Sequence, residues 1–176
     1  IFERHGDVGV VTARMRDCVY KDMKNGWPLR GVWGELLSMG PVSRRIFKRG
    51  LNYPDSYFQG KRAVYVDVVH GSMLMVDTEA FRECGGYDEG IFLYQEESVL
   101  AWRMRTNGYR TVLLLTKTYI HRHGASIGKS CESQWRRQRL RHESLMYYMK
   151  HYLYINRLQQ LAAKVWFGGI LAEIWM

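Results

Sequence analysis

The sequence has few of the residues that interrupt or cross-link a chain. Its 176 residues include three prolines and three cysteines, and it contains no repeated or low-complexity segment. Hydrophobic residues make up 47% of the chain, which is more than a disordered protein contains. A folded domain of this length buries roughly 70% of the surface of its unfolded chain. The composition therefore predicts a globular domain with a substantial core.

The cysteines lack the spacing of a disulfide framework or a metal site. Cys18, Cys84 and Cys131 are far apart and odd in number, and no C-x-x-C pair occurs. This pattern favours a reducing, cytosolic setting. The first residues have neither an initiator methionine nor the charged-then-apolar pattern of a signal peptide, and they resemble the end of a helix. We therefore expect a piece of a longer protein.

Acidic residues are outnumbered by basic ones, 17 to 26, which gives a net charge of +9. Such a surplus favours phosphate-bearing partners, for example nucleic acid, anionic lipid or nucleotide-linked substrates. Part of it lies in a basic helical stretch with four arginines between Arg136 and Arg141. A solvated helix face is the most frequent reason for such a run, and contact with a membrane surface is the next. No nucleic-acid-binding signature is present, so we expect no nucleic-acid partner.

The hydrophobic periodicity predicts strands that alternate with helices. A long excursion between the first two strand patterns carries all three prolines and two short helical patterns. The strand patterns are Asp7–Ala13, Ala63–Val76 with an interruption at Gly71, and Tyr109–His121. The helical patterns are Val32–Gly40, Val42–Gly50, a helix capped by Asp77 or Thr78, and Glu96–Gly108. This alternation predicts an α/β fold with a mixed sheet.

One carboxylate in the helical pattern Glu96–Gly108 has a position suited to catalysis. Helical spacing places Glu97 on the same face as Leu100, Ala101 and Met104. Glu97 should therefore lie at the edge of the core, facing any cleft beside the preceding glycine loop, where a general base could act. A structural role explains the residue equally well, because acids in a first helical turn are favoured by about 0.3–1 kcal/mol. On spacing alone, the structural role is favoured.

Several short motifs follow one another in a fixed order over about sixty residues. They are Gly71-Ser72, Gly85-Gly86-Tyr87-Asp88-Glu89, Phe92-x-Tyr94-x-Glu96-Glu97, Gly108-Tyr109 and His121-x-x-Gly124-x-Ser126. In this order and spacing, the region resembles the acceptor half of a family 2 glycosyltransferase of the GT-A fold, in the rhamnosyltransferase-like branch. The resemblance covers roughly residues 5–150. It implies a partial GT-A-like mixed sheet over residues 1–130, without the N-terminal nucleotide-binding half, and a helical C-terminal extension over residues 131–176.

The resemblance also implies an activity. Such an enzyme transfers a sugar from a nucleotide-sugar donor to a glycan or lipid-linked acceptor with inversion, in cell-surface polysaccharide synthesis. The matching general base is Glu97, where the family carries aspartate, and Glu96 is its supporting acid. Glutamate preserves the chemistry with a side chain one methylene longer. The alternative is an inactive membrane-associated or scaffold remnant, because the donor half is missing.

The resemblance assigns Gly71, Ser72 and Asp88 to acceptor binding. A glycine there would let a sugar approach the backbone closely, although it could equally mark a bulge. The Asp88 carboxylate could bind an acceptor hydroxyl or cap the glycine turn. The departing diphosphate implies Mg²⁺ or Mn²⁺ as cofactor, and His121 is the matching candidate ligand, with a packing role as its alternative. The family's Asp-x-Asp motif is absent, so we expect it upstream of Ile1.

The C-terminal segment from Leu158 to Met176 has a broad apolar stripe. Leu158, Leu161, Ala162 and Val165 start this stripe, and aromatic and aliphatic residues widen it further along. Charged residues interrupt the segment, which is also too short to span a membrane. We expect it to lie on an anionic membrane, at the inner face of the cell membrane in the cytoplasm. Packing against the missing N-terminal half or a second subunit is the alternative.

Overall fold

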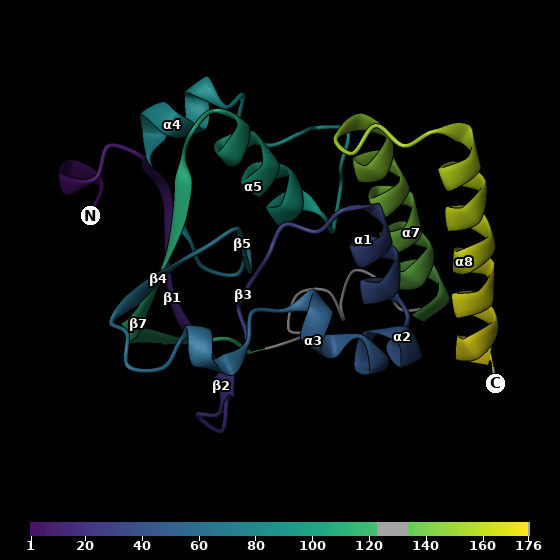
Figure 1. The fold of residues 1–176 in the computed structure, drawn as a ribbon, viewed down its shortest axis with the longest axis horizontal. Helices are drawn as coiled ribbons and strands as arrows, with labels where there is room; N and C mark the ends of the chain where they lie inside the picture. The colour runs from purple at the N-terminus through teal and green to yellow at the C-terminus, as the bar shows by residue number, and fades with distance from the viewer. Residues whose placement is uncertain (123–133, 176) are drawn as a thin grey trace. The chain divides into compact units, whose positions relative to one another are not determined.

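The computed structural model describes residues 1–122 and 134–175 and divides the chain into two compact units (Figure 1). The sheet unit comprises Ile1–Leu29, Tyr53–Asp88 and Glu96–Ala125. The helical unit comprises Arg30–Asn52, Glu89–Gln95 and Ser126–Met176. The two helices within the expected C-terminal extension thus share a unit with the excursion that contains Arg30–Asn52.

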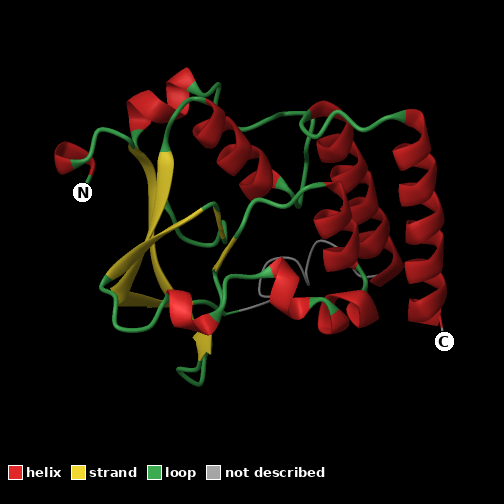
Figure 2. Ribbon diagram, viewed as in Figure 1, coloured by secondary structure: helices red, strands yellow, loops and turns green. Residues whose placement is uncertain are grey.

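The sheet unit contains the mixed sheet that the periodicity predicts (Figure 2). β1 (Val8–Arg16) and β7 (Arg110–Ile120) form a central parallel pair, and β4 (Ala63–Val66) pairs with β7 in the antiparallel sense. Two short strands, β2 (Asp22–Met23) and β6 (Met75–Val76), are antiparallel to β1. β3 (Gly26–Trp27) and β5 (Val68–Val69) form a separate antiparallel pair. The α/β fold class is confirmed, and so is the mixed sheet, because the sheet contains both parallel and antiparallel strand pairs.

The strand predicted at Ala63–Val76 is three short strands, so this prediction was wrong in its extent. Between β4 and β5, the Asp67 backbone N–H donates to the Tyr53 hydroxyl at 3.1 Å instead of a neighbouring strand. Residues between β5 and β6 leave the sheet, and there the Gly71 backbone N–H donates to Glu97 instead of a neighbouring strand. Side-chain acceptors thus replace the ladder partners of a continuous strand.

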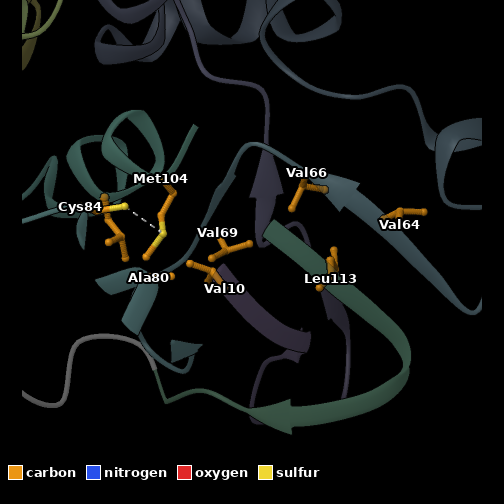
Figure 3. Close-up of a cluster of buried hydrophobic side chains, with 9 residues drawn as sticks. Val10, Val64, Val66, Val69, Ala80, Cys84, Met104 and Leu113 are labelled. Carbon is orange, nitrogen blue, oxygen red and sulfur yellow. Dashed lines mark hydrogen bonds between the residues drawn. The ribbon is translucent and has the colours of Figure 1, made fainter. Parts of the chain in front are cut away.

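The core of the sheet unit explains why β1 is apolar along most of its length. On one face, Val10 and Leu113 pack in a cluster with Met104 of α5 (Glu96–Thr106) (Figure 3). On the other face, Val8 and Val11 form a second cluster with Val112. A strand covered on both faces carries a continuous apolar run, in contrast to the alternation of a half-buried strand.

Helix boundaries in the sheet unit follow local signals. α4 (Thr78–Glu83) begins after Asp77, whose carboxylate accepts the backbone N–H groups of Glu79 and Ala80. Of the two caps that the sequence offered, Asp77 and Thr78, the structure thus shows Asp77. α5 ends before Gly108, which has a φ of +85° that side chains disfavour. The two remaining helical turns of this unit are 3₁₀ segments, η1 (Phe2–Arg4) and η2 (Asp55–Tyr57).

A register shift in β7 determines which residues lie at the end of this strand beside β1. Ala13 of β1 faces Leu114, but the next residue, Arg14, faces Thr118. β7 therefore bulges over the residues between these two partners and then rejoins β1. The Arg16 carbonyl accepts the backbone N–H of His121 at 2.8 Å, which places the end of β7 beside the end of β1.

The described part of the helical unit comprises α1 (Val32–Met39), α2 (Pro41–Ile46), α3 (Lys48–Leu51), α7 (Gln134–His151) and α8 (Arg157–Trp175). The short helices predicted within the excursion are confirmed. Its core includes Leu145 and Tyr148 of α7 and Ala163 and Phe167 of α8, all buried. The Trp166 indole N–H donates to the Leu36 carbonyl at 2.9 Å and joins α8 to α1. Within the described ranges, no helix has both the length and the apolar character required to cross a membrane.

A carboxylate is buried in this unit where the sequence pattern indicated only a helix. Glu35 of α1 is 3% exposed. Burial raises the pKa of its carboxyl, and the charge of Arg30 with hydrogen bonds from Gln95 and Ser38 offsets part of that shift. The Tyr148 hydroxyl is also buried, and it has no hydrogen-bond partner among the described residues. The raised pKa of Glu35 makes the stability of the helical unit depend on pH.

A buried histidine of α7 predicts destabilisation by acid. His142 is 7% exposed, stacks on Phe167 with ring centroids 4.2 Å apart, and forms a hydrogen bond with Gln138. Burial, with the charge of Arg141 as a second cause, lowers the pKa of His142 from 6.5 to about 4. The folded state then binds fewer protons at His142 than the unfolded state does, so the contribution of His142 to stability is present in full above about pH 6.5 and is lost as the pH drops toward 4. The expected loss is roughly 2 kcal/mol at about pH 5, measurable by urea denaturation.

Two variants test this origin of the pH dependence. His142→Phe keeps a ring against Phe167 but cannot titrate, so the loss of stability between about pH 7 and pH 5 should shrink by about 2 kcal/mol. His5→Phe changes an exposed histidine and should leave the pH dependence as it is. If the His142→Phe chain lost as much stability in acid as the parent, another group would be responsible.

Candidate active site

The first turn of α5 holds Glu97 against a backbone amide. Its Oε1 accepts a hydrogen bond from the Gly71 N–H at 3.0 Å, and the side chain is half-buried. The predicted helix face accounts for this position, because Leu100, Ala101 and Met104 are all buried. Val99, in the same helix, is also buried, at 1% exposed. A carboxylate fixed through one oxygen can still accept a proton on the other.

The Gly71 position leaves no room for a side chain. A Cβ atom built there would lie 3.0 Å from Glu97 Oε1 and 3.3 Å from Glu97 Cγ. A side chain at this position would push the Glu97 carboxylate away by a few tenths of an ångström. The close approach of Glu97 therefore favours glycine and explains the residue without a bulge.

Ser72 contacts two residues, His70 and Tyr119, that the sequence patterns did not single out. The Ser72 N–H donates to Nδ1 of His70 at 3.1 Å, so the proton of a neutral His70 ring is on Nε2. The Ser72 hydroxyl forms a hydrogen bond with the Tyr119 hydroxyl at 2.8 Å. Tyr119 lies after the bulge of β7, and this register brings it to the loop. Ser72 is exposed, and its hydroxyl and that of Tyr119 form a polar surface beside the Gly71–Glu97 contact.

His121 lies next to His70, with ring centroids 5.3 Å apart. The structure therefore brings together four of the predicted residues: Gly71, Ser72, Glu97 and His121. The additional residues are His70 and Tyr119. A sequence signal existed for both, since His70 directly precedes Gly71-Ser72 and Tyr119 is two residues before His121 in a strand pattern. Tyr119 could not be placed at the site without the register of β7.

Glu96 differs from Glu97 in its electrostatic environment. Burial raises the pKa of the Glu96 carboxyl, a hydrogen bond from its own backbone N–H offsets part of the shift, and the charge of Glu97 raises it further. The same two carboxylates and burial raise the pKa of the Tyr87 hydroxyl. Burial and the neighbouring Glu97 carboxylate thus favour the protonated form of Glu96.

Asp88 is held in the glycine turn. Gly85 and Gly86 have φ values of +77° and +65°, which glycine adopts without strain. The Arg103 guanidinium of α5 donates to both of their carbonyls, at 2.7 and 2.9 Å, and lies 3.6 Å from the Asp88 carboxylate. These contacts favour the turn role that the sequence left open for Asp88, and its acceptor-binding role stays a prediction.

Few potential metal ligands lie together in the described residues. No group of three or more histidine, cysteine or acidic side chains suited to a metal occurs within residues 1–122 and 134–175. His121 and His70 offer imidazole nitrogens, whereas Mg²⁺ prefers oxygen ligands. The residues present therefore do not fit Mg²⁺ by themselves.

The end of the last motif, at Gly124 and Ser126, lies outside the described residues, and so does His123, a second candidate metal ligand two residues after His121. A comparison with models of known protein families found no match, and neither did a comparison with curated protein sequences. The site must therefore be interpreted from its own geometry and from the motifs.

Proposed function

We propose that the chain is the acceptor-side part of a glycosyltransferase. It would transfer a sugar from a nucleotide-sugar donor to a hydroxyl of a glycan or lipid-linked acceptor, with inversion, in cell-surface polysaccharide synthesis. The observation that supports this proposal most directly is the Glu97 carboxylate, held at 3.0 Å by the Gly71 amide beside the polar Ser72 loop. The order of the motifs, from Gly71-Ser72 to His121, supports the same proposal.

The proposed reaction is a single displacement at the anomeric carbon. Glu97 accepts the proton of the acceptor hydroxyl, and the acceptor oxygen forms a bond to the anomeric carbon as the bond to the diphosphate oxygen breaks. The Gly71 N–H fixes one carboxylate oxygen, so the other is oriented toward the acceptor. Attack from the face opposite to the leaving group inverts the anomeric centre.

Neighbouring groups have supporting roles in this proposal. Glu96, whose pKa is raised by burial, stays protonated over a wider pH range and limits charge repulsion on Glu97. Ser72 and Gly71 would contact the sugar hydroxyls of the acceptor. A divalent cation, Mg²⁺ or Mn²⁺, would need ligands in addition to the candidate His121, and these would come from outside the described residues.

A donor panel tests the proposal. The full-length polypeptide is incubated with different nucleotide sugars and candidate acceptors, with Mg²⁺ or Mn²⁺ added, and release of nucleoside diphosphate is measured. We expect release above the rate of hydrolysis with at least one donor and only when acceptor is present, and activated rhamnose is the first donor to test. Absence of transfer with every donor would favour the alternative, an inactive membrane-associated or scaffold remnant.

A further inference from the structure

The helical unit has an apolar groove that opens to solvent. The groove has a volume of about 530 Å³ and lies between α1, the start of α2, and α8. From α8 it is lined by Leu158, Leu161 and Val165, which are 75%, 60% and 69% exposed. From α1 it is lined by Trp33, which is 61% exposed. Large apolar side chains with this much exposure in one groove indicate an interaction surface.

A cationic segment adjoins this groove along the chain. Gly40 and Ser43 line the groove, and the residues that follow them carry four exposed cations, at Arg44, Arg45, Lys48 and Arg49. No acidic residue occurs between Glu35 and Asp55. None of the four cations forms an ion pair within the described parts of the chain. The segment therefore has a strong local positive charge.

Exposed apolar residues alternate with these cations. They are Val42, Ile46 and Phe47, which are 54%, 69% and 48% exposed. Interleaved basic and apolar side chains on a short helical segment are typical of elements that lie in the interface of a bilayer. The cations would contact phosphate headgroups while the apolar side chains enter the acyl region.

We propose that the helical unit binds the surface of an anionic lipid bilayer through this groove and the Arg44–Arg49 segment. Charge complementarity identifies the occupant, because a second copy of the same surface would bring its four cations against those of the first. A bilayer matches both the apolar groove and the positive segment. This inference does not depend on the proposed sugar transfer.

Co-sedimentation with vesicles tests the inference on the 176-residue chain. The vesicles contain phosphatidylcholine alone or phosphatidylcholine mixed with phosphatidylglycerol. We expect binding to the mixed vesicles that weakens as salt is added, and little binding to phosphatidylcholine alone. The variant Arg44→Gln/Arg45→Gln should bind the mixed vesicles roughly fivefold more weakly for each charge removed.

The control for charge is Arg4→Gln/Lys21→Gln, which removes two exposed cations from the sheet unit and should bind as the parent does. The control for the groove compares Leu161→Ser/Val165→Ser, expected to weaken binding, with Val19→Ser/Met75→Ser, which changes exposed apolar residues of the sheet unit and should not. Circular dichroism verifies that each variant is folded.

Three results would overturn the proposal. The first is no binding of the parent chain to anionic vesicles. The second is equal binding by Arg44→Gln/Arg45→Gln and its charge control, or by Leu161→Ser/Val165→Ser and its apolar control. The third is a concentration-dependent dimer in sedimentation velocity that the Leu161→Ser/Val165→Ser variant abolishes, because the groove would then hold a second copy.

Discussion

Replacing Glu97 by glutamine should lower the rate of sugar transfer by roughly 10²–10⁴-fold in the full-length polypeptide. Glutamine keeps the size of the side chain and an oxygen that can accept the Gly71 N–H, which Glu97 holds at 3.0 Å. It cannot accept the proton of the acceptor hydroxyl at neutral pH. Turnover should therefore fall while the affinity for the donor remains nearly unchanged, as measured by steady-state kinetics and by donor binding in the absence of acceptor.

Two comparisons separate a role in proton transfer from a role in folding. Glu79→Gln changes an exposed acid in the first turn of α4 and should retain full turnover. Gly71→Ala keeps the carboxylate of Glu97 but adds a methyl group 3.0 Å from its Oε1, so it should lower turnover by displacing that carboxylate. Full activity of the Glu97→Gln enzyme would refute the assignment of the base.

Replacing Met104 by alanine should lower the free energy of unfolding by about 2–5 kcal/mol. The Met104 side chain is 1% exposed and lies in the cluster between α5 and the sheet, where its sulfur accepts the Cys84 thiol at 3.6 Å (Figure 3). Truncation would remove buried apolar surface and leave a cavity, because the β1 backbone at Gly9 has no side chain to fill the space. Urea denaturation followed by circular dichroism measures the effect.

The matched control for this variant is Met75→Ala. Met75 is 54% exposed, so its truncation should change the stability by less than about 0.5 kcal/mol. A loss below about 1 kcal/mol for Met104→Ala would show that the core around β1 relaxes into the cavity.

Local patterns predicted several elements of this fold because their signals act over a few residues. The apolar run of β1 and the Asp77 cap are examples, and so is the stop at Gly108 with its positive φ. Each depends on side chains near the element itself, through burial, a capping hydrogen bond or a backbone preference. The α5 face that carries Glu97 was predicted for the same reason, since helical spacing fixes which residues share a face.

The Ala63–Val76 stretch shows where local patterns were insufficient. Its residues favour a strand, but the Tyr53 hydroxyl and the Glu97 carboxylate accept the backbone N–H groups of Asp67 and Gly71 and divide it. These partners are far away in the sequence, so no local period contains them. The burial of Glu35 has a similar origin, because one acid in a helical pattern does not reveal whether its helix face is covered.

For the candidate site, the sequence alone determined the motifs, the helix face of Glu97 and the glycine that precedes Ser72. Only the tertiary structure decided which of these meet. The shifted register of β7 against β1 brings Tyr119 to Ser72. The His121 backbone N–H donates a hydrogen bond to the Arg16 carbonyl, and the His121 ring lies beside that of His70. The physical reason is that strand register is set by hydrogen bonds between distant segments, and a shift in pairing changes which side chains reach a given point.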